Sequence, residues 1–187
     1  MFDAPARPAP QDAPWRIEIE APADASAVEA LVLAAFGPGR FAKTAERLRE
    51  RARIAAGFVA REDGQIIGSV RLWTITVGGE PALLLGPIAV SAASRRAGLG
   101  ADLVQACVDH AGDVGILLVG DLPYFGRFGF RPAPEVRLAG PVDQHRVLWR
   151  GEDEAKGPVA ANCALPPSRG KVAGGAGRMG VLVSQAG

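Results

Sequence analysis

The chain of 187 residues carries 21 basic and 20 acidic side chains and a formal net charge of +1, so charge gives it no broad attraction to nucleic acid or to an anionic membrane. With 48% hydrophobic and 22% charged residues, the composition is that of one ordinary globular domain. Cys107 and Cys163 are too few for a disulfide framework, and with His110 and His145 they show no zinc-ligand spacing, so we expect no metal site.

The first 14 residues are rich in proline, contain Asp3 and Asp12, and lack the basic segment and apolar core of a signal peptide. We interpret residues 1–14 as a flexible leader. No apolar run in the chain reaches the length needed to span a membrane. A reduced cytoplasm is the expected location.

The segment from Trp15 to Glu20 alternates between apolar and charged residues, which predicts a strand. Asp24 is placed to cap the next helix, in which apolar residues recur at helical spacing until Gly37. A second helix is predicted over about residues 41–53. Its basic residues are Lys43, Arg47, Arg49, Arg51 and Arg53, with Glu46 and Glu50 between them. We interpret them as a solvated face rather than a patch for an acidic substrate.

Three antiparallel strands are predicted next. Residues 58–60 and 66–77 join at a tight turn at Asp63-Gly64, and residues 78–81 make the following reversal into a strand over residues 83–90. That last strand is almost continuously apolar, as expected for a central strand covered on both faces, yet Gly86-Pro87 interrupts it. A proline there predicts a bulge or a splaying of neighbours that leaves backbone groups of residues 88–90 without a strand partner.

A helix over residues 99–111 places Leu99, Leu103, Cys107 and Ala111 on one face. Cys107 is therefore predicted to be a packed core thiol rather than a nucleophile, and His110 a surface or boundary histidine rather than a base.

Residues 116–119 form a short apolar strand after a long crossover, so this strand should lie parallel to the one over residues 83–90. Asp121 can cap the short helix that follows. Val136, Leu138 and residues 147–149 supply closing strands. From residue 151 to 187 the composition shifts to Gly, Ala and Pro, which predicts a loosely structured extension or an arm against a partner subunit, as in a homodimer.

The residues between the apolar strand and the helix at 99–111 form a candidate anion site. The first turn of a helix offers backbone N–H groups without intrahelical partners and the positive end of the helix dipole. Arg95 and Arg96 add two positive charges, and Gly98 and Gly100 let a diphosphate approach the backbone closely.

Glycines at the start of a helix also occur in two other phosphate-binding motifs, and both are incomplete in this chain. A dinucleotide-binding G-x-G-x-x-G needs a third glycine where Leu103 stands, although Asp121 follows at the distance of a ribose-binding acid. A phosphate P-loop needs Gly-Lys-Ser/Thr, which the sequence lacks. A tight turn with two solvated arginines is the structural alternative.

The motif R-x-x-G-x-G at Arg95, Gly98 and Gly100 resembles the pyrophosphate loop of the GCN5-related N-acetyltransferases, and the segment ILLVGDLPYFGRFGFRPA at residues 116–133 resembles the strand, short helix and Gly-Phe ending of that family in its small bacterial members. The resemblance covers about residues 15–150. It implies an α+β fold, with a mixed, mostly antiparallel sheet flanked by helices and splayed between two parallel central strands.

The resemblance implies acetyl-CoA as a co-substrate and direct transfer of its acetyl group to an acceptor amine, for which we expect a small molecule. The diphosphate would bind at Arg95, Arg96, Ala97, Gly98, Leu99 and Gly100, and the amide arm would pair with Ile88, Ala89 and Val90. Catalysis would then be chiefly positioning of the two substrates, with a backbone N–H near Val90 polarising the thioester carbonyl.

The general acid is where the sequence departs from the family pattern. Counting back from Gly129-Phe130, the usual tyrosine falls on Phe125, which we expect to contact the cofactor but which has no hydroxyl. Tyr124, one residue earlier, is the only tyrosine of the chain and hence the only candidate phenolic acid. Two alternatives follow: a non-catalytic acyl-CoA-binding or sensing module, and an acetyltransferase acting on a protein or an aminoacyl-tRNA, which the basic helix at 41–53 would favour.

Overall fold

The computed structural model describes residues 14–39, 44–94 and 98–162. The strands are β1 (Arg16–Ile19), β2 (Ile54–Glu62), β3 (Gln65–Val77), β4 (Glu80–Val90), β5 (Ile116–Val119), β6 (Arg131–Pro132), β7 (Val136–Arg137), β8 (Val147–Arg150) and β9 (Gly157–Ala161). The helices are α1 (Ala25–Phe36), α2 (Thr44–Arg49), α3 (Leu99–Ala111) and α4 (Leu122–Phe125), with single 3-10 turns at Pro22–Asp24, Ala92–Ser94, Gly126–Phe128 and Gln144–Arg146.

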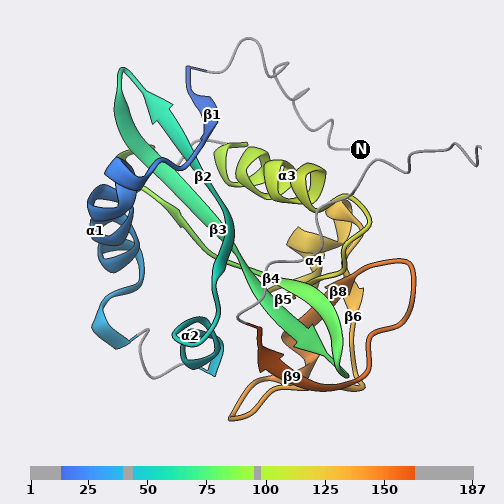
Figure 1. The fold of residues 1–187 in the computed structure, drawn as a ribbon. Coiled ribbons are helices and arrows are strands. Elements are labelled where there is room, and N and C mark those ends of the chain that lie inside the picture. The colour runs from blue at the N-terminus through green and yellow to red at the C-terminus, as the bar shows by residue number, and fades with distance from the viewer. Residues whose placement is uncertain (1–13, 40–43, 95–97, 163–187) are drawn as a thin grey trace, which may run out of the picture.

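The strands form a mixed sheet in the order β1-β2-β3-β4-β5-β8-β6. Strands β1 to β4 pair antiparallel, and β4 and β5 form the parallel pair at the centre. Helices α1 and α3 lie on opposite sides of the sheet (Figure 1). On β2, Phe58 and Ala60 pack in the core cluster of α3, and Val59 between them packs in the cluster of α1. The predicted α+β fold is confirmed.

The two predicted hairpin turns are present. Asp63 and Gly64 both have positive φ, 49° and 78°, as do Gly78 and Gly79, 61° and 96°. Two consecutive residues with positive φ make the tight turn that matches the twist of antiparallel strands. The second reversal needs only these two glycines, so β4 begins at Glu80, earlier than predicted.

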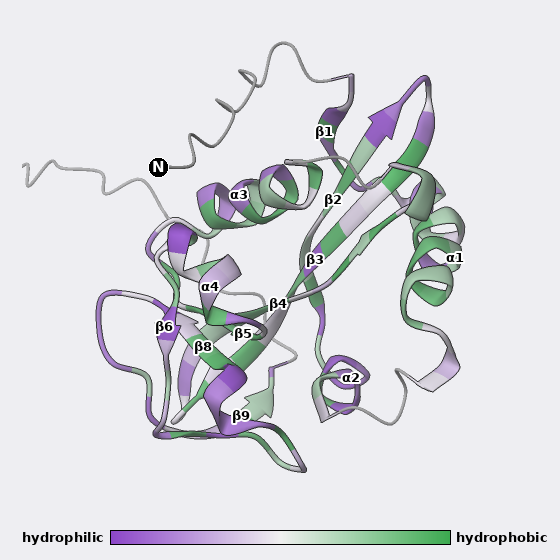
Figure 2. Ribbon diagram, turned by 180° about the vertical axis from the view of Figure 1, so that it is seen from behind, coloured by the Kyte–Doolittle hydropathy of each residue, from purple (hydrophilic) through white to green (hydrophobic). Residues whose placement is uncertain are grey.

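The helices differ in surface character. Figure 2 shows α1 largely hydrophobic and α2 largely hydrophilic. In α3, the predicted apolar face is confirmed, because Leu99, Leu103, Cys107 and Ala111 are all buried. His110 is exposed, as predicted, with its ring edge-on to Phe58 at a centroid distance of 5.7 Å.

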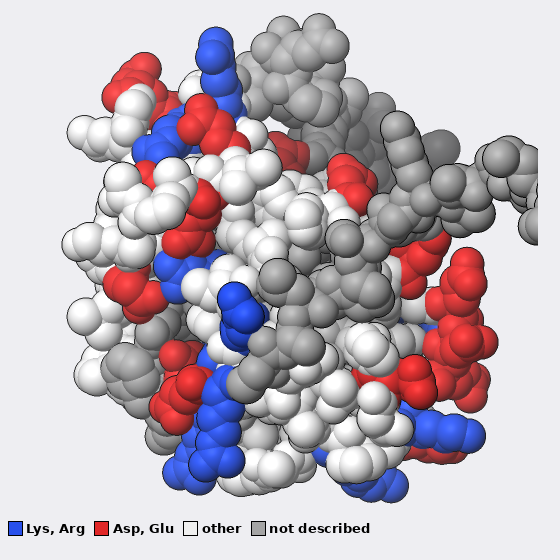
Figure 3. All heavy atoms as spheres, in the orientation of Figure 1, with Lys and Arg blue, Asp and Glu red and all other residues white. Residues whose placement is uncertain are grey.

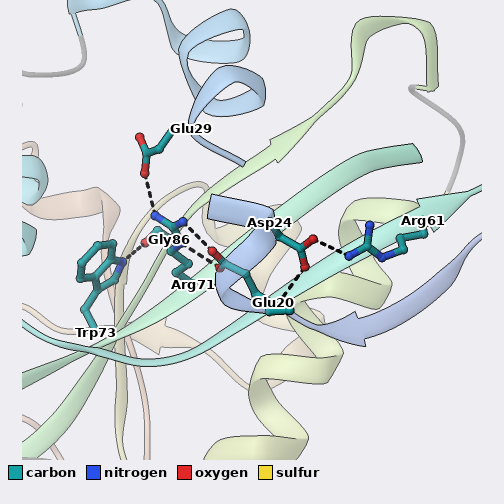
Figure 4. A network of polar contacts seen from close by, with 8 residues as sticks. Glu20, Asp24, Glu29, Arg61, Arg71, Trp73 and Gly86 are labelled. Carbon is teal, nitrogen blue, oxygen red and sulfur yellow. Dashed lines mark hydrogen bonds and ion pairs between the residues drawn. The ribbon is translucent and has the colours of Figure 1, made fainter. Parts of the chain in front are cut away.

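A polar network ties α1 and the segment between β1 and α1 to strands β2 and β3 (Figure 4). The Arg71 guanidinium on β3 donates from Nε and Nη2 to the two oxygens of Glu20, at 2.9 and 2.6 Å, and from Nη1 to Glu29 at 2.7 Å. Arg61 on β2 pairs with Asp24 at 2.7 Å. These contacts hold the start of the chain against strands more than 30 residues further on.

Asp24 corrects one prediction. It stands directly before α1, but its side chain does not cap that helix: Oδ2 accepts from the Ala21 N–H and Oδ1 from Arg61. The hydrogen bond from Arg61 lowers the pKa of Asp24 below its usual value. The ion pair with β2 therefore takes the place of the predicted cap.

The predicted loose extension begins with ordered structure. Strand β9 pairs antiparallel with the end of β3 through Ile75↔Ala161, Thr76↔Ala160 and Val77↔Val159. This part of β3 lies beyond the end of β2, whose last pair is Ile54↔Trp73, so β9 satisfies a strand edge that β2 leaves open. The rest of the extension, residues 163–187, lies outside the described residues.

Candidate functional site

A bulge interrupts β4 at the predicted Gly86-Pro87 position. Val70 pairs with Ile88 and Leu72 pairs with Leu85, so Gly86 and Pro87 together lie opposite one residue of β3. The side chain of Trp73 on β3 donates from Nε1 to the Gly86 carbonyl at 2.6 Å. The bulge predicted from the proline is therefore confirmed, and a tryptophan hydrogen bond holds it in place.

The bulge changes the neighbouring strand, β3 or β5, toward which the N–H and C=O groups of a given residue of β4 point. Before it, the Leu83 N–H donates toward β5, to the Gly115 carbonyl at 2.9 Å; after it, the Ser91 N–H donates toward β3, to the Ile67 carbonyl at 2.8 Å. The two residues are an even number of positions apart, so in a regular strand their N–H groups would point toward the same neighbouring strand. The extra residue thus directs the N–H and C=O groups of Ile88 and Val90 toward the β5 side.

Ala89 differs from its two neighbours. It is paired with Ser69 on β3, and its side chain is buried against α1. Its backbone groups therefore face β3 by the same alternation. Of the three residues predicted to offer backbone groups to a ligand, the geometry favours Ile88 and Val90.

Strands β4 and β5 separate next to this edge, as the predicted splay requires. Their parallel pairing consists of Leu83↔Ile116 and Leu84↔Leu117. Beyond these pairs a cavity of about 820 Å³ opens between the strands, lined on one side by residues of β4 up to Val90 and on the other by residues 118–121. A cavity of this size suits a small-molecule ligand or cofactor.

The start of α3 borders the same cavity. Gly98 has φ 109°, and the first helical bond runs from the Asp102 N–H to the Gly98 carbonyl, so the N–H groups of Leu99 and Gly100 precede the helical ladder. A Cβ on Gly98 would meet no atom within 4 Å, whereas a Cβ on Gly100 would lie 3.1 Å from the Tyr124 hydroxyl. Of the predicted anion loop, Arg95, Arg96 and Ala97 lie outside the described residues.

Tyr124 and Phe125 both line the cavity from α4. Tyr124 is 37% exposed, its hydroxyl reaches toward Gly100, and the Arg127 guanidinium lies 4.2 Å from its ring centre. Phe125 instead packs beside Gly120 and meets Phe130 edge-on. The single phenol of the chain therefore lies at the end of the cavity where α3 begins.

The short helix α4 is not capped by the side chain of Asp121. The Asp121 backbone carbonyl accepts from the N–H groups of Tyr124 and Phe125, while its carboxylate pairs with Arg146 at 3.1 Å. The predicted cap is therefore wrong, and an ion pair across the cavity wall replaces it.

Helix α2 adds residues to the cavity that the sequence analysis did not predict as site residues, among them an ion pair. Glu46 and Arg49 line it, with side chains only 11% and 14% exposed, and Arg49 Nη1 lies 2.8 Å from Glu46 Oε2. The helix ends at Arg49, well before residue 53. Arg47, Arg51 and Arg53 are exposed, so the predicted solvated face holds for these three and is wrong for the Glu46–Arg49 pair. Lys43 lies outside the described residues.

Cys107 has no access to this cavity. It is fully buried under α3, and burial raises the pKa of its thiol above the usual value. It is a core residue, as predicted, and a buried neutral thiol is a poor nucleophile.

These features are shared with a known protein family. The model of the acetyltransferase (GNAT) family matches residues 26–130, which include the bulged strand, the helix start and the Gly-Phe ending. The chain belongs to this family. The antiparallel order of β1 to β4 also excludes the parallel sheet of a dinucleotide-binding fold.

Two curated relatives come from Escherichia coli strain K12. The uncharacterized N-acetyltransferase YhbS is 33% identical over 145 residues, which cover 74% of this chain and 83% of the relative. The uncharacterized N-acetyltransferase YjhQ is 27% identical over 167 residues, covering 79% and 91%.

Solved GNAT structures agree with the fold. The crystal structure of Escherichia coli YhbS in complex with CoA has a TM-score of 0.67 and 29% identity, covering 79% of this chain and 89% of that one. A GNAT acetyltransferase from Brucella melitensis, in complex with acetyl-CoA, has a TM-score of 0.59 and 27% identity, covering 79% and 96%.

Figure 3 shows basic and acidic side chains interspersed on one face, without a continuous basic surface. Within residues 14–39, 44–94 and 98–162, no three His, Cys, Asp or Glu side chains are grouped to hold a metal ion. No helix in these ranges is long and apolar enough to cross a membrane.

Proposed function

We propose that this protein is an acetyl-CoA-dependent N-acetyltransferase that moves the acetyl group directly to the amine of a small molecule. The observation that carries the proposal is the open edge of β4 at Ile88 and Val90, next to the first turn of α3 in one cavity. The GNAT relatives solved with CoA and acetyl-CoA support the choice of co-substrate.

The diphosphate would bind at the start of α3, where the backbone N–H groups of Leu99 and Gly100 lie ahead of the helical ladder and Gly98 leaves open space. By resemblance to the family loop, Arg95, Arg96 and Ala97 would complete this site. The amide arm would then run along β4 and use the N–H and C=O groups of Ile88 and Val90 as a neighbouring strand would.

Acetyl-CoA brings an acetyl thioester, and the residues of this chain would position and polarise it. Holding an amine against the thioester in a fixed cleft replaces an encounter in solution, which is worth several kcal/mol. A backbone N–H of the open edge of β4, at Val90 or at Ile88 nearer the bulge, would stabilise negative charge that develops on the thioester oxygen. No side-chain acid is required at the Phe125 position in this scheme.

Thermal unfolding with added ligand tests the cofactor assignment. At a free concentration about 100-fold above its dissociation constant, acetyl-CoA should stabilise the fold by about 2.7 kcal/mol, and CoA should also stabilise it. No shift at millimolar acetyl-CoA would refute the proposal.

A non-catalytic acyl-CoA-binding module is the second candidate, because Phe125 stands where the family's tyrosine is expected. Release of free CoA thiol from acetyl-CoA, followed with a thiol-reactive dye in the presence of primary amines, separates the two. Amine-dependent thiol release identifies the enzyme, and stabilisation without release identifies the binding module.

A further inference from the structure

The α2 side of the cavity contains a buried ion pair that the proposed cofactor contacts do not use. Glu46 and Arg49 are one turn apart on α2, and both line the cavity. Arg49 also reaches the bulge: a Cβ built on Gly86 would lie 3.2 Å from its Nη2 atom. The pair therefore lies beside the middle of β4, away from the strand's end at Val90, after which α3 begins.

The position along β4 separates this pair from the anion site. Four residues of strand, from Val90 back to Gly86, span about 13 Å at the usual rise per residue. An arm that runs from the start of α3 along β4 would thus carry its reactive end toward Gly86. Residues of α2 would face the acceptor there.

The chemistry of this end favours a cation. Among the described residues of the cavity wall, the carboxylates are Glu46, Asp121 and Asp143 and the guanidiniums are Arg49 and Arg146. Each guanidinium already has a carboxylate, Arg49 with Glu46 and Arg146 with Asp121. The described wall therefore carries one more carboxylate than guanidinium, which favours an ammonium over a carboxylate in the acceptor. Glu46 is the carboxylate of the three that lies with Arg49 beside the bulge.

The remaining wall near α2 is apolar. Phe36, Pro141 and Val142 line it, and Phe36 is 41% exposed. An apolar acceptor body can pack there with its charged nitrogen at Glu46.

We propose that Glu46 is a specificity-determining residue that binds the ammonium of the acceptor, and that the acceptor class is a primary amine on an apolar body without a carboxylate. This inference rests on the proposed acetyltransferase function. Glu46 holds the ammonium form, which gives one proton to solvent to become the nucleophile. The nitrogen then bonds to the acetyl carbon, the C–S bond breaks, the amine loses its second proton, and the departing thiolate takes up one.

The test uses the full chain with acetyl-CoA and compounds that differ in one feature. Phenethylamine and phenylalanine share a body and differ in the carboxylate. A β,β-difluorinated phenethylamine has the same body but a nitrogen that stays mostly uncharged in mildly alkaline buffer. The wild type should acetylate phenethylamine with a kcat/KM at least about tenfold above that for phenylalanine.

Three variants separate recognition from structure. Glu46→Gln should lose about thirtyfold or more in kcat/KM for phenethylamine, mainly through KM, and much less for the difluoro compound. Glu46→Asp, which keeps the charge, should restore the preference for the charged amine. Glu50→Gln removes an exposed carboxylate just after α2 and should change neither.

Every other outcome counts against the inference. Equal losses for the charged and uncharged amines, or weaker acetyl-CoA stabilisation in Glu46→Gln, would assign Glu46 a structural role. A preference for phenylalanine would overturn the acceptor class. Acetyl-CoA stabilisation without acetylation of either phenethylamine also overturns it and leaves the binding assignment intact, whereas absence of that stabilisation refutes the proposed function itself.

Discussion

Replacing Arg71 with methionine should destabilise the protein strongly. The Arg71 and Glu20 side chains are 9% and 10% exposed, and two of the three hydrogen bonds of the guanidinium go to Glu20. Arg71→Met leaves the Glu20 carboxylate buried without this partner, and breaking a buried pair in this way costs about 3–5 kcal/mol. At about 2–4 °C per kcal/mol for a chain of this size, Tm should fall by roughly 6–20 °C.

Two further variants isolate the cause. Glu29 is 53% exposed, so Glu29→Gln removes a pair that water largely replaces and should cost less than about 1 kcal/mol. The double variant Arg71→Met with Glu20→Met removes both charges and should be more stable than Arg71→Met alone.

The single variant Glu20→Met completes the cycle with Arg71→Met and the double variant, and urea unfolding followed by circular dichroism gives the free energy of unfolding of each protein. If the double variant costs the sum of the two single variants, then the two charges are not coupled and the reasoning is wrong. A cost for Glu29→Gln equal to that of Arg71→Met would refute it equally.

Four other changes test the site and the core. Gly100→Asp should abolish acetyl-CoA binding in calorimetry while the protein stays folded, because it brings a side chain and a negative charge to the first turn of α3, beside the Tyr124 hydroxyl. Tyr124→Phe should lower kcat less than about tenfold and keep the shape of the pH profile, since the family position of the acid is occupied by Phe125; a far larger loss would identify Tyr124 as the acid. Cys107→Ala should cost about 0.5–3 kcal/mol of stability without loss of turnover, and peptide mapping of the native protein should find the Cys107 thiol unalkylated. Asp24 has a lowered pKa in the folded state, so its contribution is present above its ordinary pKa of about 3.9 and is lost as pH falls through the lower folded value; Asp24→Asn should flatten the acid limb of the stability profile in that range.

The features predicted correctly from the sequence are those that depend on residues close together in the chain. Asp63-Gly64 stands between two apolar runs, which predicts the first hairpin, and both residues adopt the positive φ that such a turn requires. Pro87 in an apolar strand predicted the bulge for an equally local reason, since proline cannot donate to the ladder. The face of α3 that contains Cys107 followed from a helix long enough to show its period.

Features that depend on distant partners were missed. Helix α2 has only six residues, too short for its charge pattern to reveal that Glu46 and Arg49 face inward. Strand β9 has a composition typical of a loop and becomes a strand because β3 extends past the end of β2. Asp24 and Asp121 stand at helix starts, yet an arginine from another element attracts each carboxylate.

The bulge in β4 makes the open edge depend on residue count rather than on residue identity. Substitutions at Ile88 and Val90 change side chains that pack against the α3 side of the sheet and leave the direction of their N–H and C=O groups unaltered. Deleting one residue at Gly86 or Pro87 would restore strict alternation and turn those same groups toward β3. Point substitutions would therefore leave the open edge of β4 in place, whereas deletion of a single codon would remove it. Insertions and deletions in β4 are thus the variants that test the role of this edge.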